Sequence, residues 1–372
     1  ENNVINANPD YVEIDLLSSY YSQDGENGAV TGGIGTEKLD DISTVFILNI
    51  PLDSTRSINA SFGADYYSSA STDNIDFNPS SASSHDIRAY GNIGYTKLNL
   101  KSGFSYGGRI GFSTEYDYTS VSGGINLGQV FNNGNTEIAL SLQAFIDQWS
   151  LYFPEELRGK VDVPTKSRNS YNSQLTLSQV ISKKMQLSLS AELVYMDGLL
   201  STPFHRVYFA DNDGLDIERL PSTRLKIPVS LRLNYYISDL IKLRSYYRYY
   251  TDDYGINAHT ASIELPINIS ESVTLFPFYR YHTQSASDYF AAYKTHLSTS
   301  EFYSSDYDLS ELSSHKYGLG IEYSPLYGLG RMNIPFTGRV LNLYALSLRV
   351  SRYTRDTGLT AFSAAIGLNM RF

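Results

Sequence analysis

The 372-residue chain contains no cysteine, a single tryptophan and few charged residues, 18% of the total. The absence of cysteine excludes disulfide bonds, thiol catalysis, cysteine-ligated zinc and a lipidated N-terminal cysteine. No run approaches the ~18 uncharged apolar residues that a transmembrane helix needs, so a helical membrane protein is excluded. The net charge of −10 argues against a nucleic-acid-binding protein, which would present a basic surface.

The chain is rich in tyrosine, with 32 residues, and its dominant pattern has a period of two. From Phe362 to Phe372, apolar side chains alternate with small or polar ones. Successive residues of a strand face opposite sides, so this segment has one apolar and one polar face. A helix of about 3.6 residues per turn cannot keep Lys242, Arg244 and Arg248 on one face. We therefore expect an all-β protein with minimal helix.

Turn signals divide the chain into sixteen predicted strands, and short connections largely alternate with long ones. We place the strands near residues 11–21, 40–51, 56–68, 85–98, 104–116, 117–130, 136–149, 167–181, 185–198, 223–237, 241–251, 256–269, 273–286, 312–325, 341–354 and 359–372. The long connections fall near residues 22–39, 69–84, 150–166, 199–222 and 287–311. Short periplasmic turns and long outer loops are typical of an outer-membrane barrel. The connection at 326–340 is too long for a tight turn, so a barrel of fourteen or eighteen strands is an alternative.

Two soluble folds fit less well. A β-propeller would repeat a blade motif about every 40–50 residues, and no such repeat occurs. A multi-domain β-sandwich does not require the observed pattern, in which segment after segment has apolar residues on one face and charged or polar residues on the other. A closed barrel satisfies every backbone group in a bilayer, so we predict one transmembrane antiparallel barrel over residues 1–372 with periplasmic termini.

Tyrosines near the strand ends are predicted to form an aromatic girdle at the outer interface, although tyrosine is also simply a good strand former. The residues are Tyr20, Tyr21, Tyr66, Tyr67, Tyr116, Tyr118, Tyr247, Tyr249, Tyr279 and Tyr281.

The last strand resembles the C-terminal assembly signal of bacterial outer-membrane proteins, with a terminal aromatic, an apolar residue two before it and a glycine five before it. Phe372, Met370 and Gly367 match, whereas Ala365 stands where a polar residue is expected. The resemblance implies recognition by the barrel assembly machinery. The chain opens at Glu1 without a leader, which a cleaved signal peptide would explain.

A second resemblance is sharp between residues 197 and 293 and diffuse elsewhere. It rests on the segments Asp197–Leu199, Pro203–Tyr208, Glu218–Arg224, Tyr247–Thr260 and Phe278–Ala286. These segments resemble a family of Gram-negative outer-membrane barrels catalogued only as a domain of unknown function. The resemblance implies fold and location but no activity. Members tend to be encoded beside small lipoproteins and enzymes that attach flavin to envelope proteins, which implies envelope proteins as partners.

Two groups of residues are candidates for a catalytic or metal-binding site. Asp252, Asp253 and His259 flank a short outer loop and could form a hydrolytic site, but the segment also fits a tight turn.

The other group, Asp211, Asp213 and Asp216, lies in an oxygen-rich loop suited to Ca²⁺, yet it lacks the bidentate glutamate of an EF-hand and equally fits a solvated acidic loop. The six histidines show no pairing at zinc spacing. We expect no enzyme, no catalytic residues and no cofactor.

The alternation directs many charged side chains into the lumen. A predicted basic stripe comprises Arg232, Lys242, Arg244, Arg248 and Arg280. One interpretation is that acidic and basic side chains of the lumen neutralise one another across the wall. The other is that the basic stripe faces an anionic solute, a plug or a partner chain.

The first reading of function is porin-like passage of small polar solutes. The alternative is a structural barrel that anchors or sheathes partner proteins, such as a lipoprotein, in an outer-membrane complex, including a redox complex. The loop at 150–166 is a candidate for either an inward fold or a docking edge because of its apolar residues Trp149, Leu151, Tyr152, Phe153 and Pro154. Outer-membrane lipid is the other expected partner.

Overall fold

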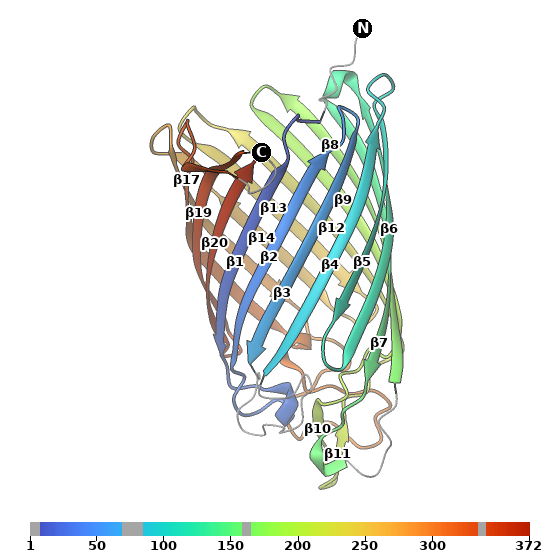
Figure 1. Ribbon diagram of the computed structural model, residues 1–372. Helices are drawn as coiled ribbons and strands as arrows, with labels where there is room; N and C mark the ends of the chain where they lie inside the picture. The colour runs from blue at the N-terminus through green and yellow to red at the C-terminus, as the bar shows by residue number, and fades with distance from the viewer. Residues whose placement is uncertain (1–7, 69–84, 158–164, 334–339) are drawn as a thin grey trace.

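The structure is a computed structural model that describes residues 8–68, 85–157, 165–333 and 340–372 (Figure 1). Sixteen antiparallel strands form one closed barrel, as the alternation predicted. The barrel strands are β1 (Glu13–Asp24), β2 (Leu39–Pro51), β3 (Arg56–Ser68), β4 (His85–Leu98), β5 (Phe104–Thr114), β6 (Tyr118–Phe131), β7 (Thr136–Ser150), β8 (Thr165–Ser182), β9 (Met185–Gly198), β12 (Thr223–Tyr236), β13 (Lys242–Asp252), β14 (Asn257–Glu264), β16 (Val273–Gln284), β17 (Leu312–Tyr323), β19 (Val340–Arg355) and β20 (Thr360–Arg371).

The barrel closes where β20 pairs with β1, from Glu13 opposite Arg371 to Asp24 opposite Thr360. The residues of the predicted assembly signal lie at this closing seam. Met370 is only 8% exposed because it packs against Ile14 and Leu341. Closure removes the two sheet edges that would otherwise leave backbone groups unpaired.

The wall of the barrel has an apolar exterior because one side chain in two points outward. Ile110 of β5 and Val121 of β6 are 70% and 65% exposed. A continuous exposed apolar surface of this kind requires an apolar surrounding, which a bilayer provides.

The first described residues and the C-terminus lie at the barrel end that carries the short turns, while β10 (Arg206–Tyr208) and β11 (Leu215–Ile217) lie beyond the opposite end (Figure 1). The described parts of the predicted long loops fall at that opposite end (Figure 1). The loop at 69–84 and residues 158–164 of the loop at 150–166 lie outside the described residues.

Helix is limited, in the described residues, to the short 3-10 turns η1 (Ala29–Thr31), η2 (Asn132–Gly134), η3 (Glu155–Leu157) and η4 (Tyr307–Leu309). None of the described helices has the length and apolar character needed to cross a membrane.

The connection at 326–340 does not add a strand to the barrel wall. β18 (Gly330–Asn333) pairs only with the start of β19 among the described strands, and β15 (Ile267–Asn268) similarly extends the ladder of β16 beyond Pro266. Residues 334–339 of this connection lie outside the described part.

The predicted tyrosine girdle is only partly correct. Tyr66 and Tyr247 face outward, as expected of a girdle, and are 50% and 44% exposed. Tyr67 instead faces the lumen and donates a hydrogen bond to Glu115, 2.8 Å away, while Tyr118 contacts the guanidinium of Arg168. Adjacent residues of a strand face opposite sides, so two neighbouring tyrosines cannot both belong to the girdle.

Candidate functional site: the lumen and its outer mouth

The lumen face of the wall is identified by ion pairs that skip strands. Arg349 of β19 pairs with Glu264 of β14, although β16 and β17 lie between them. Arg248 of β13 similarly lies 4.0 Å from Glu192 of β9, with β12 between. Such pairs form only across the concave interior. The strand register then assigns every second residue on each strand to the lumen.

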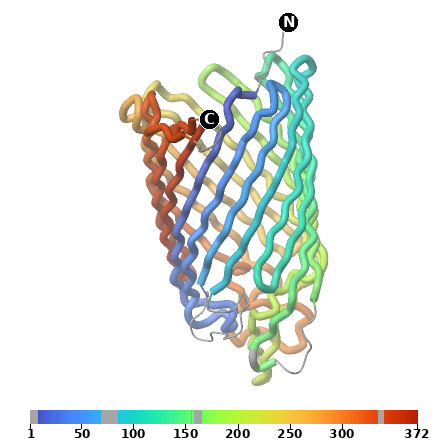
Figure 2. The backbone as a smooth tube through the Cα atoms, viewed as in Figure 1, coloured from blue at the N-terminus to red at the C-terminus, as the bar shows by residue number. Residues whose placement is uncertain are grey.

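Charges of opposite sign are concentrated on different parts of the lumen wall. The arc from β12 to β19, called here the basic arc, runs from the back of the barrel in Figure 2, in yellow, to its left side, in red. Its lumen-facing basic residues are Arg224, Lys226, Arg232, Lys242, Arg244, Arg248, Arg280, Lys316, Arg349 and Arg355. Acidic residues predominate on the remaining strands and face the basic arc: Glu13, Asp15, Asp41, Asp65, Asp86, Glu137, Asp147 and Glu192. Four arginines also face the lumen there and bond to acidic or amide partners: Arg88, Arg109, Arg168 and Arg371. The predicted basic stripe therefore lies on one arc, on β12, β13 and β16.

Only part of the basic arc is neutralised by nearby acids. Glu264 binds both Arg244, at 3.0 Å, and Arg349. Four residues of the basic arc form no ion pair within 4 Å among the described residues: Arg232, Lys242, Arg280 and Lys316. Some charges of the basic arc are thus neutralised by nearby acids, and others have no acidic partner among the described residues.

Two hollows in the lumen wall expose these groups. One, of about 480 Å³, is lined by Arg232, Arg244 and Tyr246 together with Glu264. The other, of about 650 Å³, is lined by Arg280, Lys316 and Arg349 on the basic arc, with Tyr21 and Asp41 from the acidic side. Each hollow thus combines guanidinium or ammonium groups with hydroxyl groups.

The barrel mouth opposite the short turns is covered by a cap (Figure 1), called here the outer cap and defined as residues 25–38, 151–157, 199–222 and 285–311. The cap has its own small core, in which Val207 is fully buried and Tyr303 is 2% exposed. Arg219 and Tyr303 exchange backbone hydrogen bonds of 2.9 and 2.7 Å between the two longest loops.

The cap also folds inward onto the lumen rim. The lumen-facing Gln284 donates hydrogen bonds to the carbonyls of Asp308 and Ser310, at 2.9 and 2.8 Å. Arg355, on the rim at the end of β19, pairs with Asp308 at 2.6 Å and with Glu37 at 3.7 Å.

The segment 149–154 takes the inward course of its two predicted alternatives. The Trp149 ring contacts Tyr118 in the lumen and Phe204 of the cap, and Leu151 is buried. Arg206 links the cap loops, because it donates to the Val30 carbonyl at 2.7 Å and pairs with Glu156 at 2.7 Å.

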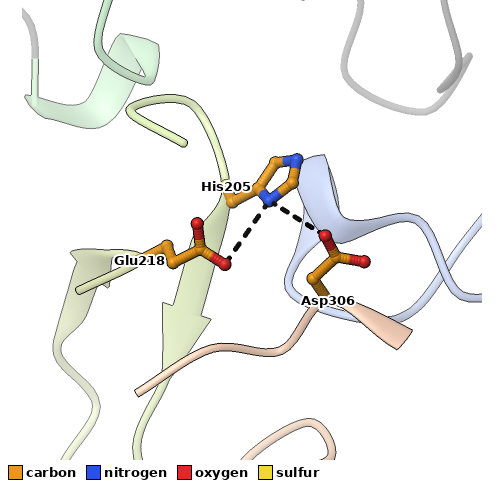
Figure 3. A group of neighbouring side chains, drawn as sticks. All are labelled: His205, Glu218 and Asp306. Atoms are coloured by element: carbon orange, nitrogen blue, oxygen red, sulfur yellow. Dashed lines mark ion pairs between the residues drawn. The ribbon is translucent and has the colours of Figure 1, made fainter. Parts of the chain in front are cut away.

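A mixed cluster inside the cap was missed from the sequence. His205, Glu218 and Asp306 converge from three points of the chain (Figure 3). Burial alone would lower the pKa of His205, but the carboxylates of Glu218 and Asp306 outweigh it and raise this pKa. Burial raises the pKa of Asp306 to about 6, and that of the neighbouring Glu37 to about 7. The histidine lies 13 and 101 residues from its partners, so no local motif could reveal the cluster.

The predicted calcium candidates lie in the same cap but do not converge. Asp211 accepts hydrogen bonds from Ser298, and Asp216 accepts one from the Tyr303 hydroxyl at 2.6 Å. Asp213 is exposed. Asp211 and Asp216 therefore join the two long loops to each other.

Two of the hydrolytic candidates, Asp252 and His259, are separated by the barrel wall, and Asp253 is exposed in the turn after β13. Asp252 faces the lumen, where it accepts a hydrogen bond from Arg224, whereas His259 faces outward and bonds to the Tyr247 hydroxyl. A base and its orienting carboxylate must be in contact, so these residues cannot act together.

The family described as Protein of unknown function (DUF3570) matches residues 54–329. Among solved structures, a bacterial polysaccharide outer membrane secretin has a TM-score of 0.49 and 11% identity, covering 100% of this chain and 99% of the secretin. Pseudomonas aeruginosa OpdK with vanillate has a TM-score of 0.44 and 8% identity, covering 97% of this chain and 98% of OpdK. The ferric enterobactin receptor PfeA of Pseudomonas aeruginosa, in complex with enterobactin, has a TM-score of 0.47 and 12% identity, covering 94% of this chain and 55% of the receptor. No curated protein matches the sequence.

Proposed function

The chain belongs to DUF3570, a family of proteins of unknown function, and we propose that it is a porin-like channel that passes small polar solutes and favours anions. The observation that supports this most directly is the set of lumen-facing basic residues without acidic partners among the described residues. Arg232, Arg280 and Lys316 remain available to bind the charge of a passing solute.

The physical basis is the width and charge distribution of the lumen. Barrels of about 16 strands leave an aqueous channel. An anion in such a channel is attracted to the basic arc and repelled by the acidic strands opposite, so it is held close to one wall. Tyr21 and Tyr246, which line the hollows, supply hydroxyl groups for hydrogen bonds with a polar solute. Rings or stripes of charged side chains set the selectivity of pores in this way.

We place the barrel in the outer membrane of a Gram-negative bacterium, with lipid around its apolar exterior and the outer cap outside the cell. The chain ends and short turns would then face the periplasm, as is usual for such barrels. The closing strand with Gly367, Met370 and Phe372 would engage the barrel assembly machinery.

A second candidate function is a structural barrel that anchors a lipoprotein or another envelope protein. The outer cap favours it, because a folded cap bonded to rim residues such as Gln284 and Arg355 narrows the route through the mouth. A closed mouth would leave the barrel as an anchor without transport.

The test is solute influx into liposomes that contain the refolded protein. Gluconate, glucose and glucosamine are similar in size and carry negative, zero and positive charge at neutral pH. We expect influx to be fastest for gluconate and slowest for glucosamine. Arg280→Gln and Lys316→Gln should each narrow this difference.

The matched control is Arg352→Gln, which removes the same charge from the outward face of β19 and should leave the order of rates unchanged. Influx no faster than in protein-free liposomes would contradict the channel and favour the structural barrel. Equal rates for the three solutes would contradict the anion preference.

A further inference from the structure

Three ligand atoms meet inside the outer cap (Figure 3). Nδ1 of His205 lies 3.8 Å from Oε1 of Glu218 and 3.8 Å from Oδ2 of Asp306. All three ligand atoms lie within 4.8 Å of one another. His205 precedes β10, Glu218 follows β11, and Asp306 caps η4 in the other long loop. The cluster therefore spans the two longest cap loops.

The histidine nitrogen is shielded from water and lacks a hydrogen-bond partner among the described residues. A buried polar atom without a partner costs free energy, so its position between two carboxylates needs an explanation. At 3.8 Å, both carboxylate oxygens are too far for a hydrogen bond.

The carboxylates are oriented by the cap itself. Glu218, 3% exposed, accepts hydrogen bonds from the Thr202 amide at 2.6 Å and the Ser304 hydroxyl at 2.5 Å. Oδ1 of Asp306 accepts from the Asp308 amide at 2.9 Å, which leaves Oδ2 directed at His205. Outer hydrogen bonds that fix ligand orientation are a regular feature of protein metal sites.

The nearby guanidinium groups bind other carboxylates. Arg355 pairs with Asp308 and Glu37, and Arg206 pairs with Glu156. Within the described residues, neither arginine forms an ion pair with Glu218 or Asp306. A buried carboxylate, that of Glu218, and a partly exposed one, that of Asp306, thus face a single imidazole.

We propose that His205, Glu218 and Asp306 bind one divalent transition-metal ion of the Zn²⁺ type, which clasps the two long loops of the outer cap. Zinc binds imidazole nitrogen and carboxylate oxygen at about 2.0–2.2 Å, and tetrahedral geometry separates such ligands by about 3.4 Å. The two distances from the imidazole nitrogen, 3.8 Å each, need to shorten by only a few tenths of an ångström, and the two carboxylate oxygens, which lie within 4.8 Å of each other, close in on the ion with it. Two carboxylates balance the charge of the ion, and a water molecule completes the fourth position.

The experiment uses the full chain without a polyhistidine tag, refolded in detergent and stripped with EDTA. Zn²⁺ binding is measured by competition with a chromogenic chelator. We expect one Zn²⁺ per chain, with affinity at least about tenfold weaker in His205→Ala and in Asp306→Asn. Asp306→Asn keeps a residue that can cap η4, so its fold is preserved. The controls are His259→Ala on the barrel exterior and Asp213→Asn elsewhere in the cap, which should bind as the wild type does.

A second readout reports on the loops. Lys294 is an exposed trypsin site in the cap, and Zn²⁺ should slow cleavage there in the wild type but not in His205→Ala. Folded wild-type protein that binds no stoichiometric Zn²⁺ would overturn the proposal, leaving His205 as an imidazolium between two carboxylates. Equal Zn²⁺ affinity in wild type and His205→Ala would overturn it as well.

Discussion

Neutralising Glu264 should make the channel more selective for anions. Glu264 is the shared partner of Arg244 and Arg349 and lines both lumen hollows. Glu264→Gln keeps the size of the side chain and its capacity to accept hydrogen bonds but removes the negative charge. Arg244 and Arg349 are about half exposed, so the variant leaves no deeply buried, unpaired charge and should fold.

The size of the effect follows from Coulomb's law. A unit charge about 7 Å from a passing ion contributes about 0.6 kcal/mol in water, and screening at 0.1 M salt reduces this to about 0.3 kcal/mol. This electrostatic energy has opposite sign for anions and cations, so the difference between the energies of an anion and a cation in the lumen changes by about 0.6 kcal/mol. This corresponds to a roughly threefold rise in the ratio of anion to cation permeability.

The assay is the reversal potential of single channels in a planar bilayer with a tenfold KCl gradient. Perfect selectivity gives about 59 mV in such a gradient, and a threefold ratio gives about 20 mV. We therefore expect Glu264→Gln to shift the potential by about 20 mV toward the value for chloride. Glu271→Gln, on an exposed turn, is the control for net charge. A shift toward potassium, or the same shift in both variants, would refute the lumen placement of Glu264.

The remaining predictions concern the cap, a turn and the wall. Arg206→Ala removes charge-assisted bonds to Glu156 and should lower the local stability of the cap by about 2 kcal/mol, measured by hydrogen exchange; unchanged protection would contradict this. Gly198 has a backbone φ of +104°, and the Cβ of an alanine there would lie within 2.2 Å of a backbone carbonyl of β8, so Gly198→Ala should lower the melting temperature of the protein. Ile110→Arg places a charge in the apolar exterior and should cost about 2–4 kcal/mol in bilayer refolding, whereas Asn126→Arg on the lumen face should be tolerated.

Much of the barrel could be predicted because its pattern is local. Alternation over each strand fixes which residues face one side, and turn signals fix where the strand ends. The same alternation placed Arg232, Arg244 and Arg280 on one face, and consecutive antiparallel pairing brought their strands into one arc. The prediction that Tyr67 and Tyr118 belong to the girdle was wrong because it followed residue type and position near a strand end and not the alternation of the strand.

The cap and the charge pairing could not be predicted because they depend on distant residues. Glu264 and Arg349 are 85 residues apart and meet only after the wall curves. His205 and Asp306 meet because loops from different strands fold over one mouth. A loop of more than twenty residues has no periodicity that specifies its partners, so sequence indicated only that such loops were polar and long.

The most direct test of the proposed channel is the single-channel conductance of the unmodified, refolded protein in a planar bilayer. We predict stable conductance steps with a reversal potential on the anion side in a salt gradient. A folded, heat-modifiable barrel that gives no conductance steps would contradict the channel and identify the outer cap as a closed lid.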